Sequence, residues 1–60
     1  MMHTITVLDG VARIEGAFTD EGVDLAGVTH VKGGEAQALA YLPVFEADLR
    51  RNFSELFPPP

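Results

Sequence analysis

The side chains that could carry out covalent catalysis are few in this chain of 60 residues, and they are scattered along it. One serine, Ser54, and two histidines, His3 and His30, are the candidates for a nucleophile and its general base. Nucleophilic catalysis needs the hydroxyl group beside a base that a third group orients. No histidine lies near Ser54 in the sequence, and the chain has no cysteine. We therefore interpret Ser54 as a solvated helix residue and predict that the protein is not an enzyme.

An acidic cluster is the nearest approach to a metal site. Asp20, Glu21 and Asp24 surround Gly22 in a short polar segment. A calcium ion takes about six to eight oxygen ligands, commonly from alternating positions of one loop. The spacing here does not supply that set, so we interpret the cluster as a solvated turn and expect no bound metal.

The segment Lys32-Gly33-Gly34 superficially resembles a nest for anions ahead of a helix, where backbone N–H groups favour negative charge. It lacks the spacing of a phosphate-binding loop, and Glu35 would place a carboxylate where the phosphate should sit. We interpret the two glycines as relieving backbone strain in a turn and expect no cofactor.

The composition limits the class of partner. Nine acidic residues against four basic ones give a formal net charge of −5, which opposes direct contact with nucleic acid or with an anionic membrane surface. No segment approaches the roughly 20 apolar residues of a membrane span, and the N-terminus lacks the pattern of a signal peptide. We expect a soluble, cytoplasmic protein.

The size of the chain indicates an outside source of stability. Domains of about 60 residues bury only about 60% of the surface that their unfolded chains expose. Without cysteine, neither a disulfide nor a thiolate zinc site can compensate. Self-association or binding to a partner protein is the remaining source of stability. We expect a homo-oligomer, with a dimer favoured over higher states.

The first third of the chain predicts a β-hairpin. Apolar and polar residues alternate through 4–8 and again through 11–18. Between the two runs stands Asp9-Gly10, the dipeptide preferred in two-residue turns that need positive φ at both positions. Gly16 weakens the second strand and suggests a bulge there.

A third strand is expected over 23–31, after the polar turn at 19–22. Its Gly27 suggests a bend or a slip of the strand. The segment 35–42 is ambiguous: its alanines favour a helix, but its alternation would also suit a fourth strand. We favour a short helix that ends near Tyr41, because Pro43 disfavours the helical conformation at Leu42.

The last segment predicts an amphipathic helix that begins at Pro43 and ends before three prolines. At 100° per residue an apolar stripe forms on one face. Its members are Phe45, Leu49, Phe53, Leu56 and Phe57. Arg50, Arg51, Ser54 and Ala47 take the opposite face, with expected ion pairs Glu46–Arg50 and Asp48–Arg51.

The whole chain is therefore expected to be one small α+β domain over 1–57 with a proline tail at 58–60. We expect an antiparallel hairpin and a third strand, and possible fourth-strand pairing by 35–42, to be covered by the C-terminal helix. The stripe carries more apolar area than so small a sheet can cover. We predict a protein-interaction module that self-associates and binds an unidentified partner protein as an inhibitor, adaptor or antitoxin-like regulator. An acidic mimic of nucleic acid and a structural assembly subunit are the alternatives. The predicted interface residues are Tyr41, Phe53, Leu56 and Phe57.

Overall fold

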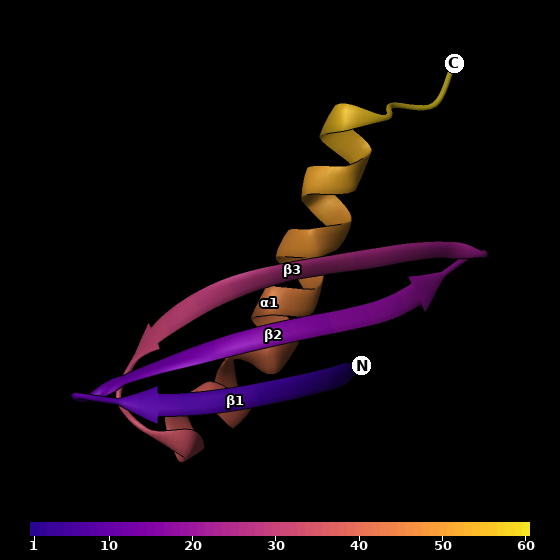
Figure 1. Ribbon diagram of the computed structural model, residues 1–60. Coiled ribbons are helices and arrows are strands. Elements are labelled where there is room, and N and C mark those ends of the chain that lie inside the picture. Colours follow the sequence, from indigo (N-terminus) through magenta and orange to yellow (C-terminus); the bar gives the residue numbers. More distant parts are fainter.

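A computed structural model describes residues 1–60 and shows a three-stranded antiparallel sheet followed by one long helix. The strands β1 (Met2–Leu8), β2 (Val11–Asp20) and β3 (Val23–Lys32) lie in the order β1-β2-β3, and α1 (Glu35–Leu56) crosses behind them (Figure 1). The predicted α+β class is confirmed, and there is no fourth strand, because the segment 35–42 belongs to α1.

Two tight turns connect the strands. Asp9 and Gly10 have φ of 50° and 73°, and Glu21 and Gly22 have φ of 51° and 80°. Positive φ at both central residues is the type I′ geometry, whose twist matches that of the flanking strands. The pairing therefore continues to the residues that flank each turn, and all three strands are slightly longer than the sequence predicted.

The alternation predicted for the strands divides the sheet into two faces. The face toward α1 carries Ile5 of β1, the odd-numbered residues of β3 and the even-numbered residues of β2, among them the buried Ala12 and Ile14. The other face carries mostly polar or exposed residues and nothing packs on it. Its members include Thr4, Thr6, Arg13, Glu15, Val28 and His30.

The two glycines in the strands form a seat for the helix. Gly16 and Gly27 are directly opposite each other in the β2–β3 ladder, and the pairing runs through both without an inserted residue. A Cβ atom at Gly16 would lie 2.8 Å from Cε2 of Phe45, and one at Gly27 would lie 2.7 Å from Cδ2 of Leu49. The bulge at Gly16 and the slip at Gly27 that the sequence suggested are therefore wrong. The glycines let the ring of Phe45 approach the backbone of the sheet.

The predicted break before Pro43 is also wrong, because α1 runs without interruption from Glu35 to Leu56. Proline removes the bond from its own nitrogen to the carbonyl of Leu39, at a cost of about 3 kcal/mol in a helix interior. Both residues are exposed, so water can reach that carbonyl. Ala38 before the proline and Phe45 after it are both buried against the same sheet, and this shared packing keeps the helix in one piece.

The molecule is elongated, with extents of 44 × 18 × 15 Å. Its Cα radius of gyration is 12.5 Å, where a compact chain of this length would have about 10 Å. The core is correspondingly small: only Ala12, Ile14, Leu25, Ala38 and Phe45 are buried apolar residues. The extra length comes from α1, whose C-terminal turns continue past β3 (Figure 1).

Candidate protein-interaction site

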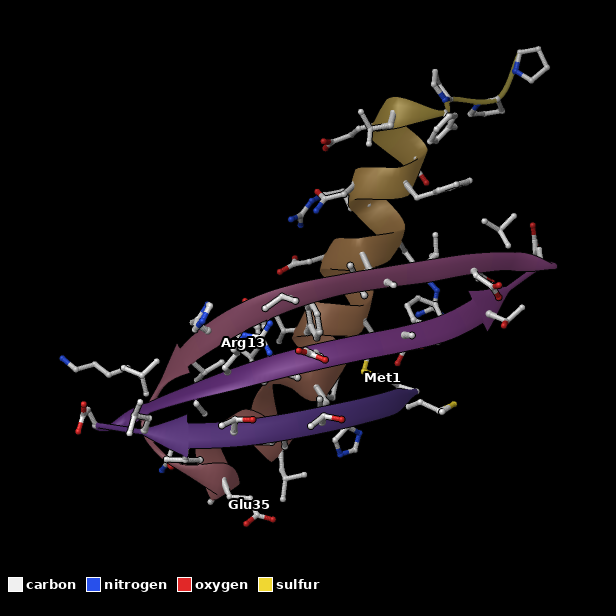
Figure 2. The ribbon with its side chains drawn as sticks, viewed as in Figure 1. Met1, Arg13 and Glu35 are labelled. Carbon is white, nitrogen blue, oxygen red and sulfur yellow. The ribbon has the colours of Figure 1, made fainter.

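The apolar stripe of α1 is buried at one end and exposed at the other. Phe45 is 4% exposed and Leu49 packs against the core, whereas Leu56 is 75% exposed and Phe57, directly after the helix, is 66% exposed. Phe53 lies between these extremes. Figure 2 shows the side chains of the last turns standing clear of the sheet. The stripe thus continues beyond the surface that it covers.

A groove of about 590 Å³ lies between this free end and β3. Thirteen residues line it, eight of them hydrophobic, and they come from the middle of β3 and from the C-terminal half of α1. Phe53 and Phe57 form one wall, with ring centroids 5.0 Å apart. Leu25 and Phe45 connect the groove to the core.

The same groove borders an unpaired edge of the sheet. The N–H of Gly33 donates to the carbonyl of Gly10 over 2.7 Å, just beyond the end of the β2–β3 ladder. Because bonded and non-bonded pairs alternate in an antiparallel ladder, the odd-numbered residues of β3 bond to β2. The N–H and C=O groups of the even-numbered residues therefore point outward, away from the sheet. They belong to Asp24, Ala26, Val28, His30 and Lys32.

This edge carries little of the protection that sheets commonly have. Proteins discourage pairing at an edge with lysine, proline, bulges or short strands. The strand β3 has ten residues, no proline and no bulge, and its charged residues, Asp24 and Lys32, stand near its two ends. The segment between them offers a flat row of donors and acceptors beside an apolar groove.

Ion pairs surround the C-terminal half of α1, and of their members only Asp48 lines the groove. Arg50 contacts Asp20 at the end of β2 through its Nε (3.1 Å) and Glu46 one turn earlier (3.0 Å). Its guanidinium group lies 4.7 Å from the ring centroid of Phe18. Both predicted helix pairs are confirmed, the second as Arg51–Asp48 at 2.9 Å. All these side chains are at least partly exposed, so the pairs contribute little stability, and only the contacts of Arg50 with Asp20 and Phe18 join the helix to the sheet.

The structure separates the four predicted interface residues into two places. Phe53, Leu56 and Phe57 all line the groove. Tyr41 lies outside it, packs against the core with most of its surface covered, and donates from its hydroxyl to Oδ2 of Asp48 over 3.4 Å. Tyr41 therefore helps to fix the helix on the sheet.

The residues considered for chemistry do not come together. His3 is opposite Gly16 and His30 is opposite Arg13, which places the two imidazoles on opposite faces of the sheet. Ser54 is exposed, and no group of three histidine, aspartate or glutamate side chains is arranged to hold a metal.

The two polar segments have structural partners. Asp20 binds Arg50, and Asp24 accepts a bond from the Thr19 hydroxyl over 2.9 Å. At the start of α1, marked by Glu35 in Figure 2, the Gly34 N–H donates to Oε1 of Gln37 over 2.9 Å. Gly33 has φ of 124°, which favours glycine. The turn interpretation of this segment is consistent with both observations.

Sequence reasoning did not identify β3 as part of the site. The sequence alone does not show which backbone groups of a strand point outward, because that depends on the phase of the ladder. The available signal was the uncharged run from Leu25 to Thr29 within a predicted strand. The contact of Arg50 with Asp20 and Phe18 was also missed, since it joins segments far apart in the sequence.

Comparison with known proteins adds no relative: no family model, no curated protein and no solved structure matches this chain. The helix α1 is too polar to cross a membrane.

Proposed function

We propose that this chain is a small protein-interaction module that self-associates and binds a partner protein through the groove between β3 and the C-terminal end of α1. In the cell it would act as an inhibitor, adaptor or antitoxin-like regulator. The observation that carries the proposal is the exposure of Leu56 and Phe57, at 75% and 66%, next to the unpaired outer edge of β3.

The exposed apolar side chains at the end of α1 leave burial free energy that the single chain does not gain. Burying a leucine or phenylalanine fully contributes about 1.5–3 kcal/mol relative to leaving it in water. Leu56, Phe57 and part of Phe53 contribute almost nothing of this within one chain. Aromatic residues in a pocket with a polar rim are the usual composition of an interface hot spot. A second protein surface over the groove would recover that free energy.

The surface area agrees with this interpretation. The chain exposes 4325 Å², where a compact protein of its mass would expose about 3,800 Å². Part of the difference belongs to the three terminal prolines. The rest is well below the roughly 800 Å² that each side contributes to a standard interface, so a partner would also cover surface beyond this excess.

Mimicry of nucleic acid receives less support. All three arginines bind carboxylates, and they engage Glu15, Asp20, Glu46 and Asp48. A mimic needs carboxylates in a row at phosphate spacing without interleaved cations. The ion pairs break such a row on both the sheet and the helix.

The test compares two charge-matched double variants. Leu56→Asp with Phe57→Asp changes the groove, whereas Leu39→Asp with Val44→Asp changes exposed apolar residues elsewhere on α1. We expect sedimentation equilibrium to give a mass above 6.5 kDa for the wild type and the second variant, and a monomer mass for the first.

Partner binding is measured with the same variants immobilised in extract from the native host. We expect at least one host protein to be retained by the wild type and the Leu39/Val44 variant and lost from the Leu56/Phe57 variant. A wild-type monomer at every concentration, together with identical retained proteins for both variants, would contradict the proposal. Growth into open-ended assemblies would instead indicate an assembly subunit.

A further inference from the structure

We infer that the self-associated form is a two-fold symmetric dimer in which β3 pairs antiparallel with β3 of a second copy, with Val28 on the symmetry axis. This inference rests on the proposed function, because it specifies how the chain associates with itself. The result is a continuous six-stranded sheet with both helices on the same face.

The phase of the ladder restricts the register. Residues that are directly opposite each other in a sheet point to the same face. Both helices can lie on one face only if odd residues of β3 stand opposite odd residues and even opposite even. The even residues carry the free N–H and C=O groups, so they form the new hydrogen-bonded pairs. Pairings centred on Gly27 or on Val28 both satisfy these conditions and use nearly the whole strand.

Charge complementarity selects the pairing centred on Val28. In that register Asp24 stands opposite Lys32 of the other copy, and by symmetry this happens twice. Ala26 stands opposite His30, and on the helix face Leu25 stands opposite Val31. Every charged residue of the strand thus meets its opposite. Centring on Gly27 would leave Lys32 at the end of the ladder without a partner.

The overhanging end of α1 has a place in this dimer. Because α1 is inclined to the strands and continues past β3, its last turns would lie under β3 of the second copy (Figure 1). Phe53, Leu56 and Phe57 then cover the helix-side surface of that strand around Thr29 and Val31, which stand opposite Gly27 and Leu25 of the first copy. The edge β1 offers no such cover, because the part of α1 that reaches past it in Figure 1 is the first turn, where the exposed residues are Glu35, Ala36 and Gln37. This difference selects β3 over β1 as the pairing edge.

The register is tested by cysteine cross-linking, which is clean because the chain has no cysteine. In a hydrogen-bonded antiparallel pair the Cα atoms are about 5.5 Å apart, within the range of a disulfide. Val28 is 50% exposed, so Val28→Cys leaves the core intact. We expect this variant to form a covalent dimer on oxidation or with a short bis-maleimide reagent. The control, Ala26→Cys, would place its two sulfur-bearing residues about 14 Å apart and should stay monomeric on denaturing gels.

Charge reversal provides a second measurement. Asp24→Lys and Lys32→Asp each place like charges opposite each other twice, so each should weaken dimerisation by roughly tenfold. The double variant restores opposite charges and should recover the wild-type dimerisation constant. Both Asp24 variants lose the bond from Thr19, so this loss cannot explain a recovery.

The outcomes separate this inference from the proposed function. Suppose that the chain dimerises in sedimentation. If Val28→Cys then does not cross-link in preference to Ala26→Cys, or if the double charge variant does not recover dimerisation, the inferred register is wrong, whereas self-association is still supported. Cross-linking through Val7→Cys on β1 in place of Val28→Cys would likewise overturn it. If the wild type remains a monomer at millimolar concentration, this inference and the self-association in the proposed function both fail.

Discussion

The two halves of α1 carry the same kind of apolar stripe, but they lie in different surroundings. The N-terminal half places Phe45 against a seat made by Gly16 and Gly27 and Ala38 in the core cluster with Ala12 and Ile14, where both are almost fully buried. The C-terminal half presents Leu56 and Phe57 to solvent beside an edge strand. The difference shows that hydrophobic periodicity specifies a face, and that the width of the sheet decides how much of that face becomes core.

The largest expected effect is at the centre of the buried half. Phe45→Ala removes a ring that is 4% exposed and leaves a cavity over the glycine pair. Such truncations cost about 3–5 kcal/mol, which is comparable to the whole stability of a small domain. We expect the variant to be largely unfolded in circular dichroism at 25 °C. A cooperative thermal transition close to that of the wild type would show that this half is not the core.

The seat itself is tested by adding one methyl group. Gly16→Ala places a Cβ atom 2.8 Å from the buried ring of Phe45, and we expect a loss of about 1–3 kcal/mol in urea unfolding. Gly27→Ala should cost less, because its near neighbour is the end of the more flexible Leu49 side chain. Ala26→Val, on the uncovered face, is the control and should stay within about 0.5 kcal/mol. Equal effects at all three positions would contradict the close approach of the helix.

Pro43 lies within the buried half of α1, between Ala38 and Phe45, and should be replaceable with a gain in stability. Pro43→Ala supplies the N–H that can bond to Leu39, and both positions are exposed. Relief of a proline in a helix interior is worth up to about 3 kcal/mol, reduced by about 0.4–1 kcal/mol because the unfolded chain becomes more flexible. We expect a net gain of about 1–2 kcal/mol in urea unfolding. A loss of stability would mean that the proline positions the C-terminal half.

The smallest effect is expected at the free end. In dilute solution, where association is negligible, Leu56→Ala and Phe57→Ala should each change the free energy of unfolding by no more than about 0.5 kcal/mol. At concentrations where the chain associates, the same variants should lower the melting temperature, because they weaken an interaction made only by the folded state. Concentration-dependent calorimetry measures both. A loss of several kcal/mol in dilute solution would place these residues in the core.

The amino-acid sequence by itself determined the elements that depend on local chemistry. Asp9-Gly10 predicted a type I′ turn because few dipeptides accept positive φ at both positions, and alternation then predicted which residues of β2 face the core. Residue spacing along one helix predicted three further features: the apolar stripe, the two ion pairs within the helix and the end of α1 before the prolines. Three of the four predicted interface residues, Phe53, Leu56 and Phe57, line one groove in the structure.

Only the tertiary structure decided what those elements meet. Local rules predicted a break at Pro43 and a bulge at Gly16, but burial on both sides of Pro43 outweighed the local penalty, and the glycine pair accommodated a ring. Tyr41 lies outside the groove and supports the core. The free edge of β3 and its outward backbone groups also depend on the phase of the ladder. The physical reason is that local preferences are set by neighbours along the chain, whereas burial is set by surfaces distant in sequence.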